Sequence, residues 1–227
     1  MQFGLIEMWQ AMGAVAKTVA MILIGLSVLT LYLFIERLIT FAKAKKSSKE
    51  VAPKLAGMLK KGQIREALAL STKKENRGSH LARVTAAGIQ SFLEGQEVRL
   101  SFEEQVETAA RGCERASIIF TQELRRGIST LGTVATSSPF IGLFGTIFGI
   151  INAFRGMALT GSGGIGAVAS GISEALITTA FGIGVAIIAL WCFNILTNRT
   201  EIYEAEMSNT SSEVVDFFIK KHEEEVE

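Results

Sequence analysis

The stretch SPFIGLFGTIFGIINAF, residues 138–154, carries no charged side chain, as expected of a helix that crosses a lipid bilayer. It nevertheless contains Pro139, three glycines and Thr146. Glycine and proline weaken helices in water but are frequent in membrane helices, where small residues let neighbouring backbones approach closely. This composition indicates a membrane helix in close contact with another helix.

The overall composition is that of a membrane protein. Of the 227 residues 48% are hydrophobic, and the formal net charge of +1 gives no indication of a nucleic-acid-binding surface. The sequence lacks a glycine-rich phosphate loop and a Ser/His/Asp grouping, and its cysteines and histidines stand apart from one another: Cys113, Cys192, His80 and His222. We therefore expect no enzymatic site, no metal and no cofactor.

Three runs without charged residues are long enough to cross a bilayer core, which needs about 20 helical residues. They cover residues 18–35, 127–154 and 175–198. The first run is not a typical cleaved signal peptide, because its basic residues follow it instead of preceding it. The sequence predicts an all-α membrane protein with three transmembrane helices and long cytoplasmic helical extensions.

Lysine and arginine predict the orientation, because they concentrate on the cytoplasmic side of membrane proteins. Residues 1–14 contain neither, whereas five basic residues follow the first span: Arg37, Lys43, Lys45, Lys46 and Lys49. Arg155 is the only basic residue in the connection between the second and third spans. The amino terminus is therefore expected outside and the carboxyl terminus in the cytoplasm.

This orientation predicts seven segments in chain order. They are a periplasmic amino terminus (1–14), a first span (15–36), a cytoplasmic helical insert (37–126), a second span (127–154), a periplasmic loop (155–173), a third span (174–198) and a cytoplasmic carboxyl-terminal helix (199–227).

The cytoplasmic parts have helical patterns. The insert has helical periodicity that breaks at Gly62 and resumes, and Ser101 and Glu104 have the spacing of a capping box. With no proline before the second span, we expect one long helix from Ser101 into the membrane. The acidic end of the tail resembles a solvated helix face, so truncation after Lys221 should be tolerated.

Small residues form one stripe on each of the last two spans, at about 100° per residue. The stripe of the second span consists of Ala135, Ser138, Gly142, Thr146, Gly149 and Ala153, and that of the third consists of Ala175, Thr179, Gly182, Ala186 and Ala189. One interpretation is tight packing between helices. The other is that both stripes line a shared cavity into which Thr146 and Thr179 present hydroxyls.

The spans lack the groups that usually relay protons. Such relays generally use a buried carboxylate, yet none of the three uncharged runs contains one. If the chain conducts protons, the titrating carboxylate must come from another subunit. Glu174, at the edge of the third span, is either an entrance group or a helix-start acid favoured by the helix dipole. Pro139 is a candidate hinge.

Two stretches resemble the ExbB/TolQ/MotA proton-channel family. They are SSPFIGLFGTIFGIINAF (137–154) and GGIGAVASGISEALITTAFGIGVAIIAL (163–190). Members of that family carry a Pro-x-x-Gly-Leu-x-Gly-Thr segment and a Gly-Ile-x-Glu-Ala-Leu-x-x-Thr-Ala segment in their last two membrane helices. The two motifs occur here in the same order, and the three spans are similar to the ExbB and TolQ branch.

The resemblance implies an inner-membrane homopentamer whose second and third spans surround a central pore. In that pore stands a dimer of single-span ExbD/TolR-like partners, each with a membrane aspartate, and proton passage drives mechanical work on the cell envelope. By position, Thr146 and Thr179 are the pore threonines and Glu174 is the acid of the third span. Thr178 is the neighbouring alternative, although the stripe favours Thr179. The transported ion is expected to be the proton, with sodium left open.

The resemblance leaves the driven process open. TonB-dependent uptake, Tol-Pal envelope maintenance, and gliding or secretion motors all use such a subunit, and the short outer amino terminus leans toward TolQ. Members often have Ile-Pro-Ala late in the third helix, where this chain has Ile187, Ile188 and Ala189. A structural scaffold without ion flux is the alternative of another class. A solute transporter fits less well, because internal repeats are not evident.

Overall fold

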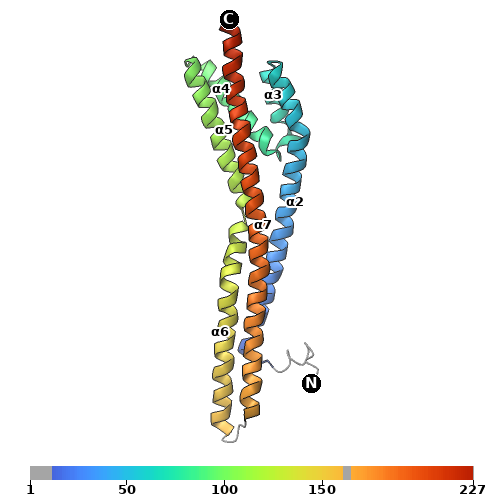
Figure 1. Cartoon of the computed structure of the whole chain (residues 1–227), viewed down its shortest axis with the longest axis vertical. Helices are drawn as coiled ribbons and strands as arrows, with labels where there is room; N and C mark the ends of the chain where they lie inside the picture. Colours follow the sequence, from blue (N-terminus) through green and yellow to red (C-terminus); the bar gives the residue numbers. More distant parts are fainter. Residues whose placement is uncertain (1–11, 161–164, 227) are drawn as a thin grey trace. The chain divides into compact units, whose positions relative to one another are not determined.

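The structure, a computed structural model, describes residues 12–160 and 165–226. This part of the chain is helical and contains no strand. The helices in chain order are α2 (Ala14–Lys60), α3 (Ile64–Ser71), the 3-10 turn η1 (Lys74–Asn76), α4 (His80–Glu97), α5 (Phe102–Arg125), α6 (Ile128–Thr160) and α7 (Ile165–Val226) (Figure 1).

The chain divides into two compact units. The apolar unit comprises residues 1–35 and 127–195, and the polar unit comprises residues 36–126 and 196–227. Helices α2 and α7 contribute residues to both units. Within the described residues, three helical stretches are long and apolar enough to cross a membrane: Ala14–Lys60, Ile128–Ala158 and Gly171–Glu224. The prediction of three candidate membrane helices is confirmed.

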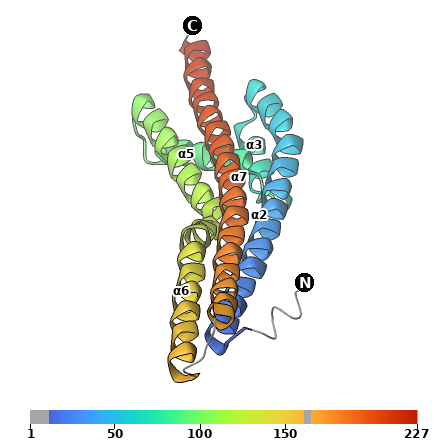
Figure 2. The same ribbon diagram turned by 60° about the horizontal axis from the view of Figure 1, so that its bottom comes forward.

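In the apolar unit, α6 and α7 lie side by side (Figures 1 and 2). The first part of α2 packs against both of them through a buried cluster: Val19, Leu23, Val134, Val185 and Ala189. The outer faces carry exposed large apolar side chains, among them Phe140 (71% exposed) and Trp191 (66% exposed). Such continuous apolar surface is stable in lipid rather than in water.

In the polar unit, α4 and α5 pack against each other along their lengths. The Ser79 hydroxyl caps α4 by accepting a hydrogen bond from the Ala82 amide, at 3.1 Å. The capping box predicted at the start of α5 is confirmed, because Glu104 accepts from the Ser101 amide at 2.9 Å while its own amide donates to the Ser101 hydroxyl. Both helices therefore begin where their sequences specify.

Two helix boundaries test where the sequence predicted a break between helices and where it predicted one continuous helix. The break at Gly62 is confirmed, since this residue lies between α2 and α3 with φ +72°. The single helix expected from Ser101 through the second span is wrong. Helix α5 ends at Arg125, and Gly127 adopts φ +79° before α6 begins at Ile128. Glycine enters this left-handed region without the steric cost that other residues pay, so it ends a helix without a proline.

Candidate functional site

The hydroxyls of Thr146 on α6 and Thr179 on α7 are in direct contact. The Thr146 hydroxyl also lies 3.1 Å from the Gly142 carbonyl on its own helix and 3.3 Å from the Ala175 carbonyl on α7. Both threonines are only partly buried by their own chain. The structure thus brings the two predicted threonines together and leaves part of each accessible.

Thr178 has a different environment from its neighbour Thr179. Its side chain is almost fully enclosed, at 1% exposure, and its hydroxyl donates to the Ala175 carbonyl at 2.7 Å. It also faces Gly145, where a Cβ atom would lie 2.8 Å from the Thr178 hydroxyl oxygen. A hydroxyl bound to its own helix in this way is a packing group. Of the two threonines, Thr179 is the one available to a second molecule.

The small-residue stripes meet at the contact between α6 and α7. A Cβ atom on Gly142 would lie 2.8 Å from the Thr178 carbonyl oxygen, and one on Gly182 would lie 2.6 Å from the Ser138 carbonyl oxygen. The glycine Cα–H groups therefore point at carbonyls of the opposite helix, an arrangement that permits weak Cα–H···O hydrogen bonds. This close backbone approach is what requires glycine at both positions.

The other stripe residues continue this contact. A Cβ atom on Gly149 would lie 2.9 Å from the Ala175 Cβ, and Ala153 packs against Gly171. Ala135 packs against the buried cluster of the apolar unit. Six stripe residues are buried within the chain: Ser138, Gly142, Ala175, Gly182, Ala186 and Ala189. The structure therefore supports the packing interpretation of the stripes, and a role in lining a pore stays a prediction.

Pro139 lies inside α6, which continues on both sides of it. The neighbouring Ser138 hydroxyl donates to the Val134 carbonyl at 2.7 Å. That bond does not replace the one that proline removes, which involves the carbonyl four residues before it, on Ala135. A hinge at Pro139 stays a prediction. Glu174 belongs to α7, but its side chain lies outside the described residues, as does the loop segment 161–164.

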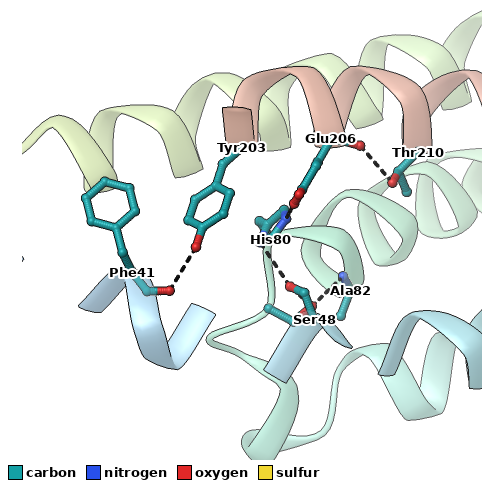
Figure 3. A network of polar contacts seen from close by, with 8 residues as sticks. Phe41, Ser48, His80, Ala82, Tyr203, Glu206 and Thr210 are labelled. Carbon is teal, nitrogen blue, oxygen red and sulfur yellow. Dashed lines mark hydrogen bonds and ion pairs between the residues drawn. The ribbon is translucent and has the colours of Figure 1, made fainter. Parts of the chain in front are cut away.

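A second polar cluster, in the polar unit, centres on His80 at the first position of α4 (Figure 3). The ring is fully buried and stacks on Tyr203 with centroids 4.6 Å apart. Its Nδ1 lies 2.9 Å from the Ser48 hydroxyl and its Nε2 lies 2.6 Å from a Glu206 carboxylate oxygen. Tyr203 in turn donates to the Phe41 carbonyl at 3.0 Å.

The hydrogen-bond partners identify which nitrogen of the neutral His80 ring carries the proton. Because a carboxylate only accepts, Nε2 carries the proton that is donated to Glu206, and Nδ1 accepts from the Ser48 hydroxyl. Burial lowers the pKa of His80 from its ordinary value, although the hydrogen bond and charge of Glu206 oppose this effect. The ring is therefore neutral and satisfied on both nitrogens.

Sequence reasoning missed this cluster, because it treated His80 as isolated. Its partners come from α2 and α7, at sequence separations of 32 and 126 residues. One signal was available, since Tyr203 and Glu206 are three residues apart and so share a helix face. Among the described residues, no group of three potential metal ligands is present.

The Thr146–Thr179 pair has limited chemistry by itself. A hydroxyl donates and accepts hydrogen bonds but holds no charge at neutral pH. The uncharged runs 127–154 and 175–198 contain no acid or base. The pair can therefore bind a carboxyl group or a water molecule, but it cannot store a proton alone.

The fold defines a helical membrane protein with three candidate spans. Two of these spans bring a pair of hydroxyls into contact within stretches that otherwise carry no charge. The sequence model of the MotA/TolQ/ExbB proton channel family matches residues 76–209. The chain belongs to this family.

Individual relatives agree with this assignment. The chain is 30% identical over 214 residues to the biopolymer transport protein ExbB of Salmonella typhimurium, an alignment that covers 92% of this chain and 83% of that protein. It is 35% identical over 122 residues to ExbB of Pseudomonas putida, covering 54% of this chain and 34% of the relative. It is also 35% identical over 125 residues to the Tol-Pal system protein TolQ of Pseudomonas aeruginosa, covering 55% and 54% of the two chains. The chain thus spans about a third of the Pseudomonas putida protein and about half of this TolQ.

Proposed function

We propose that this chain is the subunit of an inner-membrane proton channel that works with a single-span ExbD/TolR-like partner. The observation that carries the proposal is the contact between the Thr146 and Thr179 hydroxyls within the two uncharged runs 127–154 and 175–198. A partly accessible hydroxyl pair is suited to form hydrogen bonds with a carboxyl group. The uncharged runs themselves supply no carboxyl group. A membrane aspartate on the partner completes the site.

In the assembly that we propose, five copies of the chain surround the partner dimer. Helices α6 and α7 line the pore, and the amino terminus lies in the periplasm. Protons reach the partner aspartate beside Thr146 and Thr179, with Glu174 as an entrance group or a helix-start acid. Their passage moves one ring of helices against the other, and this motion performs work on the cell envelope. The proton is the proposed ion, and sodium is the alternative.

The driven process depends on the partner. Relatives named ExbB and TolQ favour energising of a TonB- or TolA-like protein, in TonB-dependent uptake or in the Tol-Pal system. A gliding or secretion motor is the other possibility within this class. Purification of the chain in mild detergent, followed by identification of the single-span protein that accompanies it, decides between them.

The channel proposal is tested by ion flux. The chain is reconstituted in liposomes with its partner, a membrane potential is imposed, and internal pH is followed with a trapped dye. Proton entry is expected with the wild-type partner and is expected to disappear when the partner's membrane aspartate is replaced by asparagine. The same assay with a sodium-sensitive dye separates the two ions.

A scaffold without ion flux is the competing function, and one observation favours it. Ser138 and Ala175 have no exposed surface, so part of each stripe is fully used in packing α6 against α7. A scaffold would give no proton entry with any partner, in the wild-type complex or in the variants. Proton flux that depends on the partner aspartate excludes the scaffold function.

A further inference from the structure

A hollow of about 390 Å³ lies on the polar unit, between α2 and the segment that contains the end of α3 and η1. Lysines line it from both sides. Lys43, Lys46 and Lys54 belong to α2, and Lys73 directly precedes η1. The volume is within the range of small-ligand sites in proteins, about 300–1,000 Å³. We call it the lysine pocket.

The charges of the lysine pocket are not neutralised from within. Within the described part of the chain, no salt bridge joins any of the four lysines to a carboxylate. Glu50 and Glu75 also line the pocket and leave it with two more positive than negative groups. A net positive charge in a concave site raises the local concentration of anions.

A second observation is an unpartnered hydroxyl at the lysine pocket. Ser47 lines the same pocket, and its enclosed hydroxyl has no hydrogen-bond partner among the described residues. Enclosed hydroxyls normally have a partner, so each exception calls for an explanation. An anion bound in the pocket would bring acceptor oxygens next to Ser47.

We propose that the lysine pocket binds a phosphate-bearing anion, supplied either by a lipid headgroup or by a soluble phosphate. Lysine ammonium groups are common phosphate ligands. Lys43 follows Ile35, the last residue of the first uncharged run, by eight positions. Basic residues at this distance from a span meet the anionic headgroups of the cytoplasmic leaflet. The site is independent of proton conduction and of the proposed channel partner.

The chain itself provides a matched control for the test. Lys45 and Lys49 lie in the same stretch of α2 as Lys43 and Lys46 but do not line the pocket. The double variant Lys45→Gln/Lys49→Gln therefore removes the same juxtamembrane charge as Lys43→Gln/Lys46→Gln.

The opposite end of the pocket is tested separately. A third double variant, Lys54→Gln/Lys73→Gln, removes lysines that are farther along the chain from the first span. The full-length proteins are placed in nanodiscs of phosphatidylcholine with a minor fraction of phosphatidylglycerol. Retained phosphatidylglycerol is counted by native mass spectrometry after mild delipidation. A second arm titrates inorganic phosphate into protein in nanodiscs of phosphatidylcholine alone, by calorimetry.

Both pocket variants are expected to lose binding by about fivefold or more per lysine, while Lys45→Gln/Lys49→Gln behaves as wild type. Retained phosphatidylglycerol without phosphate binding assigns the lipid headgroup, and phosphate binding assigns a soluble ligand. Equal losses in all three variants overturn the proposal, because the attraction is then diffuse. A loss of binding confined to Lys43→Gln/Lys46→Gln also overturns the proposal. The same holds if the wild-type protein binds neither probe.

Discussion

At the scale of single residues, Thr178 and Thr179 are adjacent in sequence but differ in what they can bind. The Thr179 hydroxyl contacts Thr146 and is partly accessible, whereas the Thr178 hydroxyl is enclosed and donates to Ala175. Sequence reasoning favoured Thr179 through the stripe and kept Thr178 as the neighbouring alternative, but it could not show which hydroxyl is accessible. Both side chains contact α6, so the difference in their burial is what distinguishes them.

This difference predicts a graded set of threonine variants. Thr146→Val and Thr179→Val each remove a hydroxyl that is available to a partner carboxyl group, so proton flux in liposomes should fall by about tenfold or more, the loss expected for one hydrogen bond to a charged group. Thr178→Val should leave most of the flux. Thr179→Ser, which keeps the hydroxyl, is the rescue control. Wild-type flux in both Thr146→Val and Thr179→Val contradicts the assignment.

His80 predicts a pH dependence of the polar unit. Its pKa is lowered in the folded state by burial, so the unfolded chain binds more protons. The stability that the neutral ring contributes is therefore fully present above pH 6.5, the ordinary pKa, and is lost as pH falls from there through the folded-state value. Thermal unfolding followed by circular dichroism should show a lower midpoint below pH 6.5.

Substitution of His80 isolates the contribution of this ring to the stability of the polar unit. His80→Gln should lower the midpoint above pH 6.5, because the two hydrogen bonds of the buried ring, to Ser48 and Glu206, are lost at a cost of about 1–3 kcal/mol. It should also reduce the fall of the midpoint at acidic pH. His222→Gln is the comparison variant: it removes an exposed ring that only stacks on Phe102, so it should lower the midpoint less than His80→Gln does. An unaltered pH profile in His80→Gln excludes His80 as the source.

At the scale of helices, the contact between α6 and α7 depends on glycine at two facing positions. Gly142→Ala or Gly182→Ala would place a Cβ atom within 3.0 Å of backbone atoms on the opposite helix, so the helices must separate, at a cost of about 1–3 kcal/mol. Gly184 on α7 has open space around it, and Gly184→Ala is the matched control. Thermal unfolding followed by tryptophan fluorescence should show lower midpoints for the first two variants only. Equal midpoints in all three variants would mean that the close approach does not stabilise the pair.

The carboxyl-terminal part of α7 is held by ring contacts that the sequence did not reveal. Phe218 stacks on Phe92 with centroids 3.9 Å apart, and His222 stacks on Phe102 at 3.8 Å. Sequence reasoning considered the acidic end of the tail and expected truncation after Lys221 to be tolerated. That variant removes the His222 ring contact, so the structure predicts a small loss rather than none.

A truncation series tests these contacts. Termination after His222 should leave the unfolding midpoint unchanged, because it removes only the acidic end of the tail. Termination after Lys221 should cost about 0.5–1.5 kcal/mol, the range for one ring pair. Termination after Asp216 removes the buried Phe218 and should destabilise the polar unit most. Equal midpoints for all three proteins contradict the ring contacts.

Helix existence was predictable from sequence, but helix continuity was not. Runs without charge specified the three candidate spans, and the Ser101–Glu104 spacing specified the start of α5. The interruption at Gly127 was missed because proline was taken as the signal that ends a helix, and a single glycine with positive φ has the same effect. The contacts of His80 were missed because they join segments far apart in sequence.

At the scale of the whole molecule, the two units are suited to different surroundings, the apolar unit to lipid and the polar unit to water. The apolar unit exposes large apolar side chains such as Phe140 and Trp191, which only lipid or other apolar helices can cover. The polar unit buries its aromatic residues behind exposed charged side chains, as a water-soluble protein does. A denaturant that weakens the burial of apolar side chains away from water should therefore unfold the polar unit first.

One buried free cysteine in each unit makes this difference measurable. Cys113 lies in the polar unit and Cys192 in the apolar unit. Urea weakens burial from water but does not remove the lipid around a membrane helix. In liposomes, Cys113 of the Cys192→Ser variant should react with a membrane-permeant maleimide at a lower urea concentration than Cys192 of the Cys113→Ser variant. Coincident labelling transitions would contradict this prediction, because they would show that the two units unfold as one.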